Sequence, residues 1–142
     1  MGLFNKKKEV AFEATKAFMV DMLQYDEKRK LIKIKGEKQP IAIEDITGYS
    51  LTFGNKTYTK ANLGRAFIGG AAFGLAGIIL AGTHQEEYVS NIKLTIIACG
   101  KPHFILLTLG KVKMNAAKGI LDRAEAMVRF LDEVCNENEK SV

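Results

Sequence analysis

Alternating apolar and polar side chains predict a series of short β-strands in the first half of the chain. In residues 31–35 two isoleucines alternate with two lysines, the two-residue period of a strand with one buried face. Three further strands are predicted at 17–25, 40–43 and 49–53. The polar turn Asp26-Glu27-Lys28-Arg29 separates the strand at 17–25 from the strand at 31–35. Gly54-Asn55 makes a hairpin turn into Lys56-Thr57-Tyr58.

The strand pattern resumes after residue 87 and gives way to a helix. A fifth strand is predicted at 88–99 and a sixth at 104–109, with Gly100-Lys101-Pro102 as the turn between them. The sixth strand is apolar on both faces, so we expect another element of secondary structure to cover one of these faces. Residues 115–136 carry an apolar stripe opposite a charged one, and this amphipathic helix is the expected cover. Residues 136–142 are polar and predicted to fray.

About six antiparallel strands followed by one helix indicate the α+β class. A small, strongly bent sheet capped by the C-terminal helix would bury both the apolar strands and the helix stripe. At 142 residues the chain, 1–142, is most simply one domain. The basic N-terminus, residues 1–12, is predicted to be flexible.

A glycine-rich apolar stretch, residues 61–83, interrupts the strands between the fourth and the fifth. No charge falls in the 18 residues between Arg65 and His84, and a helix of that length reaches about 27 Å against a hydrocarbon core of about 30 Å. A single span would place the first four strands and the last two on opposite sides of a bilayer. A helical hairpin returns the chain to its starting side, so we predict a glycine-rich hairpin.

Small residues within this stretch recur at the spacing that lets helices approach closely. Gly70 and Gly74 form a GxxxG pair, although glycine is disfavoured in a helix interior by about 1 kcal/mol relative to alanine. Close packing against a membrane, a second copy or the protein's own barrel would explain them. The candidate interaction residues are Gly64, Arg65, Phe67, Gly69, Gly70, Phe73, Gly74 and Gly77.

Composition and charge narrow the class of function only slightly. A net charge of +5 permits an anionic membrane surface or nucleic acid as a partner. The chain has no Trp, and its aromatic residues occupy apolar strand positions, so we do not expect nucleic acid to be the partner. Two cysteines are too few for a secreted disulfide framework, which favours a reducing cytoplasm.

No catalytic constellation or cofactor motif emerges from the sequence, and we expect a non-enzymatic protein without a cofactor. The only histidines are His84 and His103; the latter follows Cys99 across a turn, which offers two ligands where structural zinc needs four. Hydrogen-bond contact between Cys99 and His103 would be required for a nucleophilic pair. Gly64 and Gly69 have P-loop spacing, but Gly70 follows where lysine should stand.

Several segments resemble the pleckstrin-homology-like barrels of bacteria. More narrowly, they resemble short, largely uncharacterised glycine-rich-insert proteins of Gram-positive bacteria and their prophages. The matching residues are Ile43-Glu44-Asp45-Ile46, Gly48-Tyr49, Leu63-Gly64-Arg65-Ala66, Gly69-Gly70, Phe73-Gly74 and Gly77. The resemblance covers roughly residues 18 to 135 and implies a scaffold that binds lipids, peptides or proteins, without choosing among them.

Two functional hypotheses follow. In the first, the barrel is a scaffold and the hairpin mediates membrane association or self-association, in the cytoplasm or peripherally on the inner face of the membrane. In the second, the chain is a soluble prophage accessory protein that binds and modulates a host protein.

Overall fold

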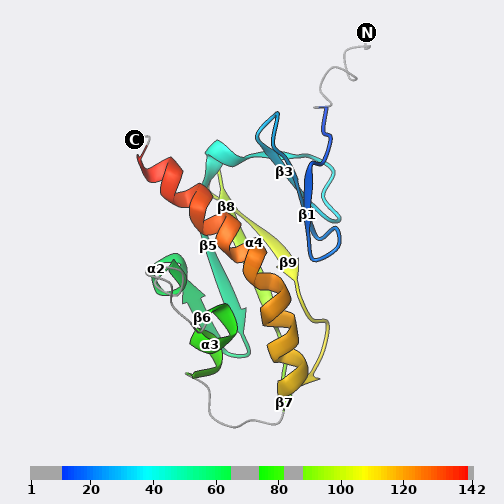
Figure 1. The fold of residues 1–142 in the computed structure, drawn as a ribbon, viewed down its shortest axis with the longest axis vertical. Helices are drawn as coiled ribbons and strands as arrows, with labels where there is room; N and C mark the ends of the chain where they lie inside the picture. The colour runs from blue at the N-terminus through cyan, green and yellow to red at the C-terminus, as the bar shows by residue number, and fades with distance from the viewer. Residues whose placement is uncertain (1–10, 65–73, 82–87, 141–142) are drawn as a thin grey trace.

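The computed structural model describes residues 11–64, 74–81 and 88–140. As predicted, the protein is α+β, with antiparallel sheets and a C-terminal helix (Figure 1). The elements are β1 (Lys16–Phe18), β2 (Leu23–Asp26), β3 (Leu31–Ile34), β4 (Ile41–Ala42), the 3-10 helix η1 (Ile43–Asp45), β5 (Ile46–Phe53), β6 (Lys56–Thr59), α2 (Lys60–Gly64), α3 (Gly74–Ala81), β7 (Tyr88–Val89), β8 (Lys93–Ala98), β9 (Lys101–Leu106), β10 (Val112–Lys113) and α4 (Met114–Lys140).

The first sheet has the strand order β1-β2-β3-β4, and it corrects the single strand predicted for 17–25. That segment holds β1, a reversal, and β2, because Met19 and Val20 both adopt positive φ and the Met22 N–H donates back to the Met19 carbonyl. Neither Met nor Val is typical of turns, since β-branched and long apolar side chains rarely adopt positive φ. The apolar sequence of this segment therefore did not predict the hairpin.

The second sheet has the strand order β6-β5-β8-β9, so β6 and β9 are its two edges. Its β8–β9 hairpin turns at Cys99 and Gly100, both with positive φ (53° and 75°), as a type I′ turn requires. The predicted turn at 100–102 thus lies one residue too late, and the sixth strand runs over 101–106 rather than 104–109. Pro102 is accommodated because an edge strand does not need its N–H.

Helix α4 lies diagonally across the inner face of the second sheet and closes the core (Figure 1). Burying each large apolar side chain there stabilises the fold by about 1.5–3 kcal/mol. Phe130 joins the helix to the first sheet, with its ring centroid 5.2 Å from that of Phe18 and 4.7 Å from that of Tyr25. Fully buried side chains in this core include Leu51, Leu94, Ile96, Leu121, Val128 and Leu131.

The C-terminal helix is longer than the predicted 115–136. Residues 136–140 are helical because Asn138 Nδ2 donates to the carbonyl oxygens of Ile43 and Ile46, at 2.8 and 2.7 Å. These bonds fasten the last turns of α4 to η1, the corner where the chain passes from the first sheet to the second. Of the residues predicted to fray, 136–140 are therefore held by a tertiary contact, and 141–142 lie outside the described residues.

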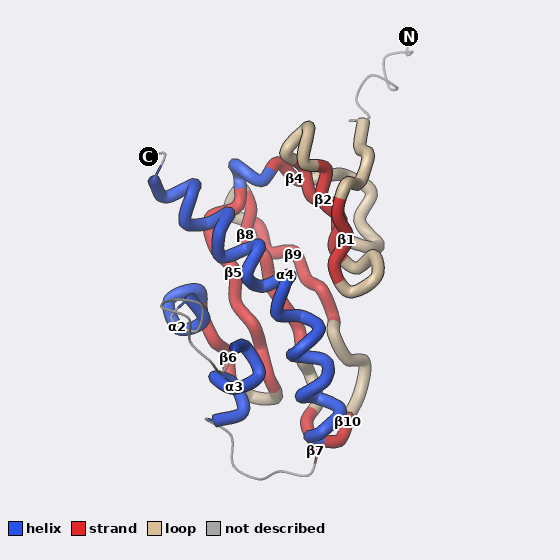
Figure 2. The backbone as a smooth tube through the Cα atoms, in the orientation of Figure 1, coloured by secondary structure: helices blue, strands red, loops and turns tan. Residues whose placement is uncertain are grey.

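The described strands form no closed barrel, and they are shorter and more numerous than the six predicted (Figure 2). Ten strands are distributed over two four-stranded sheets and the two-stranded pair β7–β10. Within residues 11–64, 74–81 and 88–140, no helix has both the length and the apolar character needed to cross a bilayer.

Candidate functional site

Of the predicted interaction segment, 61–83, the structure describes 61–64, which lie in α2, and 74–81, which form α3. Helix α2 contacts β6, and α3 packs on α4. Three candidate residues, Gly64, Gly74 and Gly77, fall in these two helices. The other candidates, Arg65, Phe67, Gly69, Gly70 and Phe73, lie outside the described residues.

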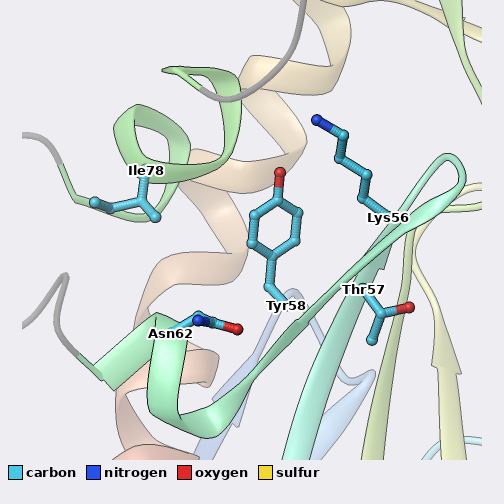
Figure 3. A pocket seen from close by; sticks show the side chains of 5 residues that line it. All are labelled: Lys56, Thr57, Tyr58, Asn62 and Ile78. Atoms are coloured by element: carbon cyan, nitrogen blue, oxygen red, sulfur yellow. The ribbon is translucent and has the colours of Figure 1, made fainter.

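Helix α3 packs on α4 as part of the core. Leu75 and Ile79 are fully buried and Ala76 is nearly so, one helical turn covering the positions that face α4. The side chain of Ile78 is only partly buried and points into an open pocket on another side of the helix (Figure 3). The helix is therefore apolar beyond the face that the fold buries.

Gly74 sits at the start of α3 where the helix meets a carboxylate of α4. The Leu75 N–H donates to Glu125 Oε1 at 2.9 Å, which satisfies one of the backbone donors that a helix start leaves unpaired. Glu125 is held in turn by Arg129 Nε at 3.2 Å. Gly74 has a φ of +63°, and a Cβ there would run into Glu125 Oε1. The left-handed backbone favours glycine at this position, and a side chain would also displace the Glu125 oxygen that accepts from Leu75.

Gly64, at the end of α2, lies against a second carboxylate of the same helix. A Cβ on Gly64 would lie 3.1 Å from Asp132 Oδ1, closer than an ordinary contact. Asp132 is buried, and it accepts hydrogen bonds from the Tyr49 hydroxyl at 2.9 Å and from Asn136 Nδ2 at 3.2 Å. Burial, together with the neighbouring Asp132 carboxylate, raises the pKa of Tyr49, so this phenol stays a donor.

The two carboxylates form one seat for the insertion. Glu125 and Asp132 are seven residues apart on α4, close to two helical turns, so they lie on the same face. Each receives one glycine of the insertion. The small residues thus meet carboxylate side chains of the protein's own C-terminal helix.

Between β6, α2 and α3 the described residues line an open pocket of about 490 Å³ (Figure 3). Tyr58 lies at its centre, and burial raises the pKa of this phenol; its hydroxyl donates to the Ile79 carbonyl at 3.5 Å. Asn62 Oδ1 accepts from the Thr59 N–H and hydroxyl, at 3.2 and 3.0 Å, which fixes the start of α2. The lining residues are Lys56, Thr57, Tyr58, Asn62 and Ile78.

The alternative Cys99–His103 site is not assembled. His103 Nδ1 lies 3.0 Å from both carboxylate oxygens of Glu37, so the imidazole is engaged by the loop after β3. A hydrogen bond with Asp45, with the negative charge of that carboxylate, raises the pKa of the Cys99 thiol. Both effects weaken the thiol as a nucleophile. Among the described residues no three metal-ligating side chains gather, and His84 lies outside them.

Asp26, which the sequence places in a polar turn, is fully buried instead. Burial acts to raise the pKa of its carboxyl, but hydrogen bonds from the Glu13 and Arg29 N–H groups and from Arg29 Nη1 outweigh it and lower the pKa. The carboxylate ties the chain before β1 to the β2–β3 turn. Its local sequence resembles any solvated turn, so no sequence signal marks it.

Sequence reasoning also missed the opposite edge of the second sheet. Phe104 and Leu106 of β9 are each half exposed, and Leu109 beyond them is almost fully exposed. Helix α4 covers only the inner face of this sheet. The signal available in the sequence was charge, since residues 88–121 contain lysines and no Asp or Glu.

Comparison of the chain with protein-family models, curated proteins and solved structures finds no match.

Proposed function

We propose that the protein is a non-enzymatic binding module on a pleckstrin-homology-like scaffold. Its glycine-rich insertion is the contact element, and it docks on a membrane surface or on a second copy of the chain. The module works in the cytoplasm, where the membrane version would place it peripherally on the inner face.

The scaffold part of the proposal is supported by where the resembling residues lie. Ile43-Glu44-Asp45 forms η1, the corner between the two sheets, and this corner is fastened by Asn138 of α4. Tyr49, in the same motif, binds Asp132 of α4 across the core. The motif therefore occupies the junction of both sheets with the C-terminal helix, the place that determines how a bent sheet is capped.

The contact part rests on one observation, the apolar surface that α3 carries beyond its buried face. Leu75 and Ile79 already anchor this helix on α4, and Ile78 adds an apolar side chain at the rim of an open pocket. Folding of the described residues leaves that side chain only partly buried. The Ile78 side chain could then make an apolar contact with a surface outside the domain.

Ile78→Glu in the full-length protein tests this. Two measurements distinguish docking on a membrane from docking on a second copy. They are flotation with vesicles of phosphatidylglycerol and phosphatidylcholine, and light scattering on a size-exclusion column. The wild type is expected either to float with vesicles or to form a dimer or larger species, and Ile78→Glu should abolish whichever is seen. Thr57→Glu, the same charge on the β6 side of the pocket, is the matched control and should retain it.

A wild-type protein that is monomeric and stays out of the vesicle fraction would overturn the proposal. Equal loss in Ile78→Glu and Thr57→Glu would assign the effect to charge near the pocket and contradict a contact made by α3.

The second candidate, a soluble prophage accessory protein that binds a host protein, is favoured by a different observation. The β9 edge of the second sheet is unpaired among the described strands and apolar. Affinity purification from the native host should recover one stoichiometric partner, and deletion of residues 61–83 should leave that partner bound if the sheet edge is responsible.

A further inference from the structure

The β9 edge is the second surface of the molecule with a recognisable binding geometry, and it lies across the sheet from the insertion. Of the strands that the structure describes, β9 pairs with β8 alone. Its backbone therefore presents one row of hydrogen-bonding groups outward, the arrangement that accepts an added strand.

The hairpin turn determines which backbone groups point outward. In a type I′ turn at Cys99 and Gly100, the flanking pair Ala98 and Lys101 exchanges hydrogen bonds. Hydrogen-bonded and non-hydrogen-bonded pairs then alternate along the ladder, so His103 and Ile105 bond to β8. The N–H and C=O groups of Phe104 and Leu106 consequently point away from the sheet. Pro102, the remaining outward position, has no N–H.

The start and the end of β9 differ in protection. Lys101 and Pro102 are the residue types that keep sheet edges from pairing, and they stand at the start. Phe104 and Leu106, which supply the outward N–H groups, carry large apolar side chains on the outer face, each 50% exposed. Pairing is thus favoured at the second half of the strand.

Charge distinguishes the kind of partner. Lys93 Nζ lies 5.0 Å from the centroid of the Phe104 ring, beside the open edge. Lys93 pairs with Leu106 in the register, so its side chain lies on the same outer face as Phe104 and Leu106, and β8, the turn and β9 contain no Asp or Glu. The nearby carboxylate of Glu37 is engaged by His103. A second copy would bring the same lysine to this edge, and like charges across paired strands are destabilising.

We propose that β9 binds an extended segment of a partner protein that presents apolar and acidic side chains on one face. The segment adds a fifth strand to the second sheet through the outward backbone groups of Phe104 and Leu106. On the outer face, its apolar side chains pack on those two residues and its carboxylates lie toward Lys93. The proposal is independent of the contact assigned to α3, and it names the kind of segment that the second candidate function would bind at this edge.

The probe for this edge is a fluorescein-labelled peptide of two Val-Thr-Glu-Thr repeats with blocked ends, called the Val-Glu peptide, whose valines and glutamates share one face. The Val-Lys peptide has lysine in place of each glutamate. Binding to the full-length protein is followed by fluorescence anisotropy and by amide chemical shifts, and the shifts should centre on residues 104–106. Methylation of alternate backbone nitrogens in the peptide should weaken binding at least about tenfold, because strand addition needs those donors. The Val-Lys peptide should bind more weakly than Val-Glu.

Charge reversal sharpens the test without touching the backbone groups. The variant Lys93→Glu should prefer the Val-Lys peptide, while Ile78→Glu should bind Val-Glu as the wild type does. Three results would overturn the proposal: no amide shifts in β9, equal binding of the methylated peptide, or an unchanged charge preference in Lys93→Glu. A wild-type dimer with amide protection at 104–106 would assign the edge to a second copy, also against it.

Discussion

The two edges of the second sheet differ in what covers them. At β6 the chain continues directly into α2, and α3 returns over Tyr58, so helices of the insertion flank that edge (Figure 2). At β9 no described element adds hydrogen bonds beyond β8. Helices therefore flank the β6 edge without burying it, since Lys56, Thr57 and Thr59 stay exposed, and the β9 edge retains its pairing capacity.

These two edges show that an apolar residue pattern does not by itself indicate burial in this protein. The apolar residues of α3 look like a binding surface in sequence, yet most of them are buried on α4. Those of β9 look like core, yet two of them are half exposed. Position relative to α4 separates the two cases, because α3 packs on that helix whereas Phe104 and Leu106 lie on the outer face of the sheet.

Among variants that test the difference between the two edges, Leu75→Ala in α3 should have the largest effect on stability. Removing a fully buried leucine should lower the free energy of unfolding by about 2–5 kcal/mol, measured as a shift of the urea midpoint at constant slope. The control is Leu109→Ala beyond β9, which is 91% exposed and should change stability by less than about 0.5 kcal/mol. Equal effects would mean that α3 is not part of the core.

Gly74→Ala should have the next largest effect. The left-handed backbone and the clash with Glu125 together should cost about 1–3 kcal/mol in a urea titration. Gly110→Ala is the matched control, since its φ is ordinary and a Cβ there would meet nothing within 4 Å. If the two variants are equally stable, the contact between α3 and Glu125 does not hold in solution.

Tyr49→Phe tests the seat of α2 on α4. Loss of the hydroxyl deprives buried Asp132 of a hydrogen bond, which should cost about 1–3 kcal/mol of unfolding free energy. Tyr58→Phe serves as control, because its hydroxyl makes only a 3.5 Å bond in a partly buried place, and less than about 1 kcal/mol is expected. A larger loss in Tyr58→Phe would reverse the ranking of the two contacts.

Leu106→Gln should have the smallest effect on stability, below about 1 kcal/mol, because half of this side chain is already in water. It should still weaken binding of the Val-Glu peptide several-fold in the anisotropy assay. Thr57→Gln, an exposed substitution on the β6 edge, is the control for binding and should leave it unchanged. A stability loss as large as that of Leu75→Ala would place Leu106 in the core and remove the contrast between the edges.

Local patterns alone predicted the class of fold, the position of the insertion and the amphipathic character of α4. Periods of two and of 3.6 residues record which side of an element is buried, and this information is carried by neighbours in sequence. Gly74 and Gly77 were identified as candidates because glycine is disfavoured within helices and its presence calls for a spatial reason, whereas Gly64 belongs to the residues that carry the family resemblance.

Only the tertiary structure decided which surfaces those elements pack against. The reversal at Met19 and Val20, the burial of Asp26 and the last turns of α4 all depend on partners distant in sequence. The same holds for the carboxylates that receive Gly64 and Gly74, and for the edge that stays open. Periodicity indicates that a face is buried, but contacts across 50 or more residues choose the surface against it, as with Leu75 and Glu125. The length of residues 61–83 is compatible with a membrane span, but the parts that the structure describes are short helices that contact α4.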